Sequence, residues 1–481
     1  MKKLFILCIL ILLAAACGRG EESVTLTPDG LVQRTLTIRG NDNFRFVVEQ
    51  ARNMLNESWQ ERGYYLTINF ERFEVIEWDG GDFEAWHSSN ELRMGRLRTE
   101  LMSGMGPDLV FNENFPLYQF AQSALLVDFY TLMDNCNRTS RDDFFVNVLK
   151  ANEFRGGLYE LPMMFGFHYI GINNNIPDSI LYRFTQYSYI RASDLIELYF
   201  DFLDNYNEFL QIGLWTTLFN PANSNIMNYI DLDTNTVNLN GSGFIESHLL
   251  FNRLEFGLHS NWQQIVMPIA SADHVRTLGG TNMFRSCNVN FNPADAFIDR
   301  NIPFGSFLPL ANDYGALVVN LRENLVSGNN MNTMLPNIWM PSTRNTALAW
   351  EFTYYLIAAF SEPYDLAAVI PGWGMVAQWG RTTFNVPIMR SLFESNIHAT
   401  FEHLDYFLYS RHGFEIEDID TAVQNAIERI NKYANMPMVL SRPHLPMNLI
   451  YSPLFDFLRG LITEQEAITR AENAMTLWLM E

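Results

Sequence analysis

The sequence predicts an α/β protein with two lobes, and two observations support that prediction. Within residues 36–70, apolar residues alternate at strand spacing, then recur at helical spacing, and then alternate again. The chain of 481 residues is also longer than one hydrophobic core usually supports. We therefore expect two lobes, each with a mostly parallel sheet flanked by helices.

The first lobe opens with a strand that contains Leu36 and Ile38, a helix with apolar residues over 44–59, and a second strand over 66–70. A strand, a helix and a strand in this order imply a right-handed crossover. Because such a crossover returns the chain in the same direction, the two strands should pair in parallel.

A second helix is predicted to begin at Ser88, because Ser88 and Glu91 have the spacing of a capping box. Glycines and a proline at 104–107 should end this helix, since Gly tolerates positive φ and Pro cannot continue a helix. A strand over 109–111 and a helix over about 116–126 follow.

Two more helices are expected in the second half of the chain. The run 347–360 is apolar nearly all round, which indicates a helix buried in a large core. Thr463 and Glu466 form another capping box at the start of the last helix. The buried stripe of that helix should consist of Ile468, Ala471, Met475 and Trp478.

The N-terminus has the composition of an export signal. Lys2 and Lys3 precede an apolar run over 4–13, which is too short to cross a bilayer, and small residues lead to Cys17. The segment resembles a bacterial lipobox, although Ala14 stands where that motif prefers Leu. The alternative is an ordinary secretory signal that happens to contain Cys17.

The lipobox resemblance implies cleavage of residues 1–16 and lipidation of Cys17, as by palmitate, at the outer face of the cell membrane. Residues 17–35 would then form a polar, flexible tether. Cleavage leaves 465 residues and changes the formal charge from −22 to −24, since it removes two lysines and no acid. Such acidity makes nucleic acid an improbable partner and is simply explained by solubility.

Two cysteines remain after Cys8 leaves with the signal and Cys17 becomes the anchor. Cys136 and Cys287 show no metal-site spacing. They form either one disulfide or two buried thiols.

Motifs for catalysis and cofactor binding are poor. Residues 372–377 match a dinucleotide fingerprint only superficially, because Pro371 precedes them and no strand, turn and helix surround them. Residues 231–242 imitate a calcium loop but lack its glycine and closing glutamate, and so indicate a turn. His398 and His403 do not share a helical face. We expect no catalytic residue, cofactor or metal, although the many acidic residues leave a glycosidase pair open.

Two long fragments, 96–111 and 115–134, resemble the family 1 extracellular solute-binding proteins of ABC transporters. They contain a helix, a Gly-x-Gly-Pro-Asp turn, a strand, and a helix that ends in a Leu-Leu-x-Asp phrase. Further fragments follow in the order of that family, at 156–173, 230–244, 342–356 and 457–479.

The resemblance implies a two-lobed, periplasmic-binding-protein-like fold of type II, with hinge crossings between the lobes. The crossings would lie near residues 149–160, 305–315 and 371–395. Lobe 1 would then take residues 36–150 and about 311–375, and lobe 2 would take about 151–310 and 376–481.

The same resemblance implies a receptor that captures a small solute, a sugar by preference, and delivers it to the permease subunits of an ABC importer. Such a receptor is expected to be a monomer tied to the membrane by its lipid. A surface-anchored carbohydrate-active enzyme is the alternative, and an adhesive or structural lipoprotein is a third class.

Ligands of open α/β sheets lie beyond the carboxyl ends of the strands, which selects the loops after the first and third strands. These loops contain Asn41, Asp42 and Asn43, and Asn112, Glu113 and Asn114. Short amides and carboxylates match sugar hydroxyls, but the same residues also favour turns for their own backbone hydrogen bonds.

Aromatic rings offer apolar faces on which a sugar can rest. Trp373, in a Pro-Gly-Trp-Gly sequence near a predicted hinge, is the first candidate. Phe167 and Tyr169 follow, and Trp215 and Tyr451 are the remaining candidates.

Overall fold

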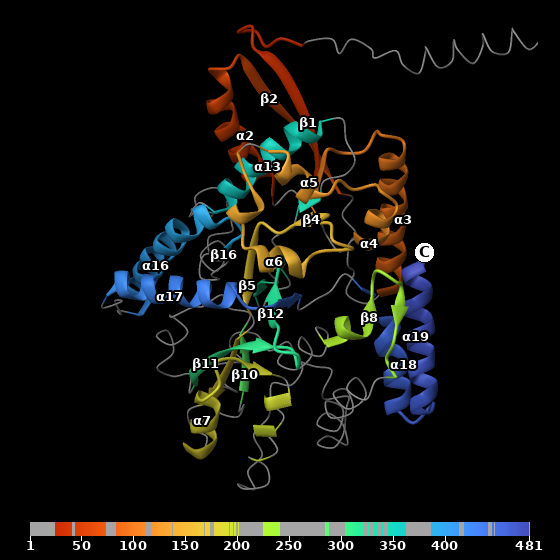
Figure 1. Cartoon of the computed structure of the whole chain (residues 1–481). Helices are drawn as coiled ribbons and strands as arrows, with labels where there is room; N and C mark the ends of the chain where they lie inside the picture. The colour runs from red at the N-terminus through yellow and green to blue at the C-terminus, as the bar shows by residue number, and fades with distance from the viewer. Residues whose placement is uncertain are drawn as a thin grey trace, which may run out of the picture.

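The structure is a computed structural model. It describes residues 25–40, 44–73, 83–111, 117–136, 138–167, 169–173, 178–191, 193–195, 197–198, 201, 225–240, 284–287, 304–321, 325–327, 331–333, 338–339, 345–361, 386–412, 418–440, 445–446 and 448–480. In these ranges the chain forms two large sheets and two small two-stranded ones, β8-β9 and β13-β14, with helices around the large sheets (Figure 1).

The first sheet has the strand order β2-β1-β3-β15-β4. β1 pairs in parallel with both β2 and β3, as the strand–helix–strand pattern predicted. β15 is antiparallel to β3 and β4. The strands are β1 (Val32–Gly40), β2 (Tyr64–Arg72), β3 (Leu109–Phe111), β4 (Glu160–Leu161) and β15 (Ile338–Trp339).

The second sheet is mixed, whereas a mostly parallel sheet was expected. Its path is β10-β6-β11-β12-β5-β16, with antiparallel pairs along it, while β7 and β17 join in parallel. The short connection between β11 and β12 favours antiparallel pairing, because parallel strands need a long crossover. The strands are β5 (Met164–Phe167), β6 (Tyr169–Asn173), β7 (Ile190–Arg191), β10 (Phe284–Cys287), β11 (Phe304–Ala311), β12 (Leu317–Asn320), β16 (Val386–Pro387) and β17 (Met438–Leu440).

The chain leaves the first sheet after β4 and enters the second at β5. It is still in the second sheet at β12, returns to the first at β15, and re-enters the second at β16. The lobe boundaries predicted from the sequence, including the one near residue 311, stay predictions.

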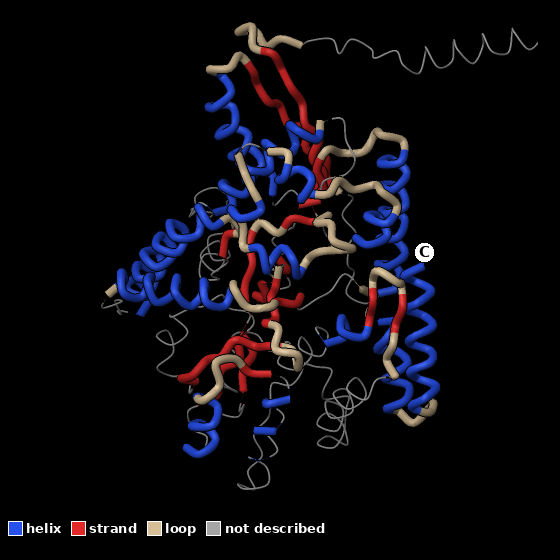
Figure 2. The backbone as a smooth tube through the Cα atoms, viewed as in Figure 1, coloured by secondary structure: helices blue, strands red, loops and turns tan. Residues whose placement is uncertain are grey.

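Two helices pack against each other beside the first sheet, and one of them, α2, packs directly on β2 (Figures 1 and 2). α2 (Arg45–Gln60) buries an apolar face that includes Val48 and Leu55, and α13 (Thr346–Ser361) buries Phe352 and Leu356. The predicted helix over the 347–360 run is confirmed, but its burial is not complete, because Ala347 is exposed and Tyr354 and Tyr355 are only partly buried. The apolar cluster that these helices help to form continues into the second sheet.

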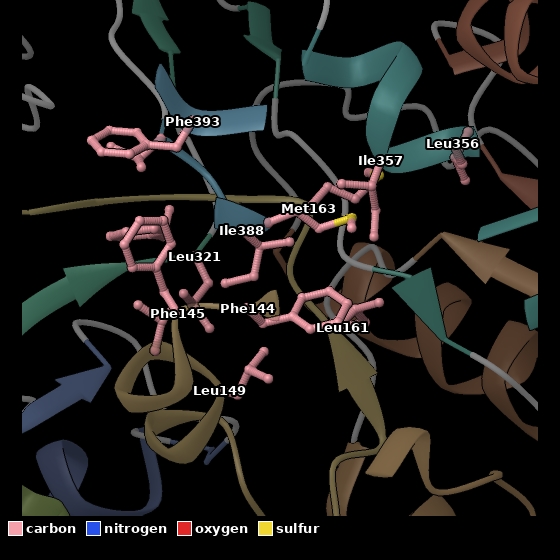
Figure 3. Close-up of a cluster of buried hydrophobic side chains, with 14 of the residues drawn as sticks. Phe144, Phe145, Leu149, Leu161, Met163, Leu321, Leu356, Ile357, Ile388 and Phe393 are labelled. Carbon is pink, nitrogen blue, oxygen red and sulfur yellow. The ribbon is translucent and has the colours of Figure 1, made fainter. Parts of the chain in front are cut away.

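Figure 3 shows the middle of this first cluster, where side chains from α13, the β4–β5 crossing, α6 (Val146–Ala151) and α16 (Arg390–His412) meet. Because one continuous cluster links elements of both sheets, burial of apolar surface holds the crossing in place. The labelled side chains are Phe144, Phe145, Leu149, Leu161, Met163, Leu321, Leu356, Ile357, Ile388 and Phe393.

A second cluster joins α3 (Phe83–Met102) and α4 (Leu117–Gln122) to α18 (Asn448–Leu458) and α19 (Glu464–Met480). In α19 three residues of the predicted stripe, Ile468, Ala471 and Met475, are buried, whereas the fourth, Trp478, is only partly buried. The hydroxyl of Thr463 accepts the Glu466 N–H at 3.2 Å, while the Glu466 carboxylate pairs with Arg470.

Two helix boundaries differ from the prediction. α3 begins at Phe83, so Ser88 and Glu91 lie inside it. The capping-box spacing also fits a helix interior, and no Gly or Pro over 83–87 stops an earlier start. α4 ends at Gln122 because the chain turns at Ala124, whose φ is +53°.

The hairpin of β8 (Ile230–Asp231) and β9 (Thr236–Val237) confirms the predicted turn, which consists of residues 232–235. Oδ1 of Asp231 accepts the backbone N–H groups of Asp233 and Thr234, at 2.9 and 3.1 Å. The carboxylate therefore serves the turn itself.

The remaining elements are α5 (Phe129–Asp134), α7 (Asp178–Thr185), α17 (Ile419–Ala434), β13 (Leu325–Ser327), β14 (Met331–Thr333) and the 3₁₀ helices η2 (Arg141–Asp143) and η3 (Met227–Tyr229). Cys136 is a free, partly buried thiol. In the part of the chain that the structure describes, no helix is long and apolar enough to span a membrane.

Candidate functional site

The carboxyl ends of β1 and β3 lie side by side. The parallel register places Ile38 opposite Leu109 and Arg39 opposite Val110, so both strands end at one edge of the sheet. That edge is where an open α/β sheet holds its ligand. The predicted polar residues that follow the two strands, Asn41, Asp42, Asn112, Glu113 and Asn114, lie outside the described residues, so their role stays a prediction.

Gly40 and Phe111 fix the packing at this edge. A Cβ atom on Gly40 would collide with the Phe111 ring, so only glycine allows the two strand ends to approach so closely. The Phe111 ring in turn packs on Phe44 at the start of α2, with ring centroids 5.4 Å apart. The two loops therefore start from a closely packed base.

Arg39 ties three elements together one residue before the end of β1. Its Nε and Nη2 donate to Oε2 of Glu71 at 3.0 and 2.6 Å, and its Nη1 donates to Oε2 of Glu100 at 2.6 Å. Burial alone would lower the pKa of Arg39, but its hydrogen bonds with both carboxylates raise that pKa above its ordinary value. The guanidinium thus stays charged and links β1, β2 and α3.

Asp108, in the Gly-x-Gly-Pro-Asp turn, closes the opposite end of β3. Its carboxylate accepts the Thr37 N–H at 2.7 Å and the Asn345 amide at 3.3 Å, while its own N–H donates to the Thr37 carbonyl at 2.7 Å. The turn therefore has the structural role that its sequence indicated. Sequence reasoning did not single out Asp108, although its position between Pro107 and a strand was a usable signal.

Asp128, in the Leu-Leu-x-Asp phrase, connects the start of α5 to the segment that leads into β4. Its Oδ1 accepts the Tyr130 N–H, which caps α5, and also the Leu158 N–H, both at 2.9 Å. Further along, the buried Asn152 amide donates to the Glu160 carbonyl at 2.8 Å. The crossing between the sheets is thus held by specific polar contacts that periodicity could not reveal.

The predicted aromatic residues lie in different parts of the structure. Phe167 is 2% exposed and packs edge-to-face on Phe165 and Tyr433, so its ring faces protein here. Tyr169 is in β6, where its register partners are Cys287 of β10 and Pro309 of β11. Its side chain is not among those that the structure describes.

Tyr451 is on α18 and packs against the second cluster, where burial raises the pKa of its hydroxyl. Trp215, Trp373 and Cys17 lie outside the described residues. The structure does not bring the described candidates into one site, and their roles stay predictions. Within the described ranges, no three His, Cys, Asp or Glu side chains are placed to hold a metal ion.

A scan of protein-family models finds no match for this chain, and a search of curated proteins finds none either. Solved structures do match along nearly the whole chain. A Synechococcus sp. MITs9220 protein assigned as an oligosaccharide periplasmic-binding protein is 12% identical, with a TM-score of 0.53 over 92% of this chain and 99% of that one.

Two further solved structures have a similar fold over nearly the whole chain. A family 1 extracellular solute-binding protein of Alicyclobacillus acidocaldarius is 12% identical, with a TM-score of 0.51 over 94% of this chain and 99% of that one. UspC of M. tuberculosis is 13% identical, with a TM-score of 0.50 over 92% and 100%. The chain has the fold of the two-domain periplasmic-binding-protein class, and the predicted fold is confirmed.

Proposed function

We propose that this chain is the solute-binding receptor of an ABC importer and that it captures a sugar or oligosaccharide between its lobes. The observation that carries the proposal is the fold likeness, which extends over 92% of this chain and 99% of a protein assigned to oligosaccharide binding. The ordered sequence fragments of family 1 solute-binding proteins support the same class. Both the fold likeness and the sequence fragments fit a protein that binds a solute without catalysing a reaction.

The proposed mechanism is closure of the two lobes on the ligand. The chain passes between the sheets after β4, after β12 and before β16, and these passages are the places where a hinge can act. A ligand that contacts both lobes binds the closed state more tightly and so shifts the population toward it. The loops after β1 and β3, together with Trp373, are the proposed contacts.

The proposed location is the outer face of the cell membrane, with Cys17 lipidated and the receptor monomeric until it meets the permease subunits. Labelling of cells with radioactive palmitate tests the anchor. We expect labelled wild-type protein and no label on Cys17→Ser, which should appear in the medium. A labelled Cys17→Ser protein would remove the anchor from the proposal.

Thermal unfolding with a panel of sugars tests the ligand class. Maltotriose, cellotriose, xylotriose and raffinose are compared with trialanine and spermidine. A ligand at 100 times its Kd stabilises the folded state by about 2.7 kcal/mol, so at least one sugar should raise Tm measurably. No shift with any sugar would overturn the sugar assignment, and shortened sugars in chromatography would establish an enzyme instead.

Two substitutions test the proposed contacts. Asn112→Ala and Trp373→Ala should weaken binding of the sugar that gives the largest shift in the panel, with Tm of the free protein retained. Asn53→Ala, an exposed asparagine on α2, is the control and should bind normally. Normal affinity in both test variants would reject this placement of the site.

A further inference from the structure

The turn between β11 and β12, residues 312–316, holds Tyr314 in an exposed position. The Asn312 N–H donates to the Ala316 carbonyl at 2.8 Å, and the Gly315 N–H donates to the Asn312 carbonyl at 3.0 Å. Oδ1 of Asn312 accepts the N–H groups of Tyr314 and Ala316, at 3.1 and 2.9 Å. Gly315 has a φ of +80°, which favours glycine. The turn is therefore fixed by its own hydrogen bonds.

Asp313 anchors this turn to two other segments. Its carboxylate accepts the Ser193 N–H at 3.2 Å and the amide of the buried Asn225 at 2.8 Å. The Asp313 N–H returns a hydrogen bond to Oδ1 of Asn225 at 3.0 Å. A reciprocal pair that includes a charged group is stronger than a single neutral hydrogen bond. These hydrogen bonds fix the backbone from which the Tyr314 side chain projects.

A second tyrosine meets Tyr314 at its tip. The Tyr314 hydroxyl donates to the Tyr229 hydroxyl at 3.4 Å. Tyr229 ends η3, and its ring packs partly against the second cluster. Burial and the contact with Tyr314 raise the pKa of Tyr229, so its hydroxyl stays neutral near pH 7. The contact brings the β11–β12 turn next to η3.

We propose that Tyr314 and Tyr229 form a carbohydrate contact, with the Tyr314 ring as a platform for the apolar face of a sugar and the two hydroxyls as partners for its OH groups. The inference rests on the proposed sugar-binding function. It adds a site on elements that the sequence did not single out, because the two tyrosines are 85 residues apart in the chain.

Three properties of the tyrosine pair favour a sugar as its ligand. The Tyr314 side chain is 63% exposed, so its ring contributes little to the core and remains open to a ligand. A tyrosine has only two side-chain torsions, and the turn beneath it is already ordered, so binding costs little additional entropy. Neutral hydroxyls both donate and accept, as sugar hydroxyls require.

Titration calorimetry with the four sugars of the panel tests the proposal. Tyr314→Ala should weaken binding of the sugar that gives the largest thermal shift by roughly fivefold, since an aromatic contact contributes about 1 kcal/mol. Tyr314→Trp keeps the platform and should retain most of the affinity, whereas Tyr314→Phe tests the hydroxyl alone. Tyr182→Ala is the matched control, because Tyr182 on α7 is 66% exposed and should not matter.

The outcomes separate this proposal from the function on which it rests. If the wild type binds a sugar and Tyr314→Ala binds it equally well at unchanged Tm, the tyrosine contact is wrong while the receptor function stands. Equal weakening in Tyr182→Ala would also overturn it. If the wild type binds none of the four sugars, both the sugar-binding function and this contact fail.

Discussion

Gly40 illustrates how much one position can depend on its neighbours in space. In the structure Gly40 is the last residue of β1 and lies against the Phe111 ring of β3. The requirement for glycine here comes from this close approach across the sheet. No local pattern contains that information, because the two residues are 71 positions apart.

Substitution of Gly40 and of Gly95 by alanine should therefore change the free energy of unfolding in opposite directions. Gly40→Ala should lower the free energy of unfolding by about 1–3 kcal/mol, because the added methyl group overpacks against Phe111. Gly95→Ala, in an exposed part of α3 with nothing near its Cβ position, should raise it by about 0.5–1 kcal/mol. Urea unfolding measures both, and equal effects would contradict the packing at the sheet edge.

At the scale of elements, the N-terminal cap of α17 is a pH-sensitive contact. Asp418 caps α17, where its Oδ1 accepts the Thr421 N–H at 3.0 Å. This backbone hydrogen bond, with the Thr421 hydroxyl, lowers the pKa of Asp418 below its ordinary value. A lowered folded-state pKa means that the ionised form stabilises the helix above the unfolded pKa of about 3.9, and that this stabilisation is lost as the pH falls through the folded value.

The gap in Tm between wild type and Asp418→Ala should accordingly narrow as the pH is lowered from 7 to about 3. Asp418→Asn keeps a neutral oxygen acceptor, so its Tm relative to the alanine variant should not depend on pH. Thermal unfolding at several pH values checks this. A constant gap for wild type would show that ionisation of Asp418 does not contribute.

The last helix allows a matched test of the second cluster. Met475 in α19 is 0% exposed and Leu477 is 61% exposed, two residues further on. Met475→Ala should cost about 2–5 kcal/mol of unfolding free energy, because it leaves a cavity among α3, α4, α18 and α19. Leu477→Ala should change stability little. A small loss at Met475 would mean that this cluster contributes less than its burial indicates.

Element types were easier to predict than element boundaries. Strand and helix spacing correctly identified β1, α2, β2 and α19, because burial of one face imposes a period on the sequence, and a short apolar run identified β3. The capping box at Ser88 was wrong as a helix start, since short polar motifs also occur inside helices. The short strands β4, β15 and β16 carry too few residues for any period.

The proposed function predicts that the two lobes close on the bound sugar. A saturating sugar from the panel should reduce the radius of gyration in small-angle X-ray scattering, since it favours the closed state of the two lobes. Trialanine provides the control and should leave the scattering unchanged. Binding without compaction would reject hinge closure while leaving the ligand class intact.

The candidate site was predicted only in part. The edge at the ends of β1 and β3 follows from strand order, and the structure confirms that these ends adjoin. The ligand residues on the loops beyond stay predictions, and the Tyr229–Tyr314 pair was not anticipated, because contact between distant loops leaves no periodic signal.

The sequence by itself determined the α/β class, the parallel start of the first sheet, the buried helices α13 and α19 and the resemblance to family 1 solute-binding proteins. These features arise from local period, turn chemistry and ordered fragments, which a single chain carries in its own sequence. The mixed second sheet, the cluster that joins both sheets, the Arg39 and Asp128 contacts and the tyrosine pair were decided only by tertiary structure. Their physical cause is packing and hydrogen bonding between residues far apart in the chain, and the free energy of those contacts depends on the complete fold.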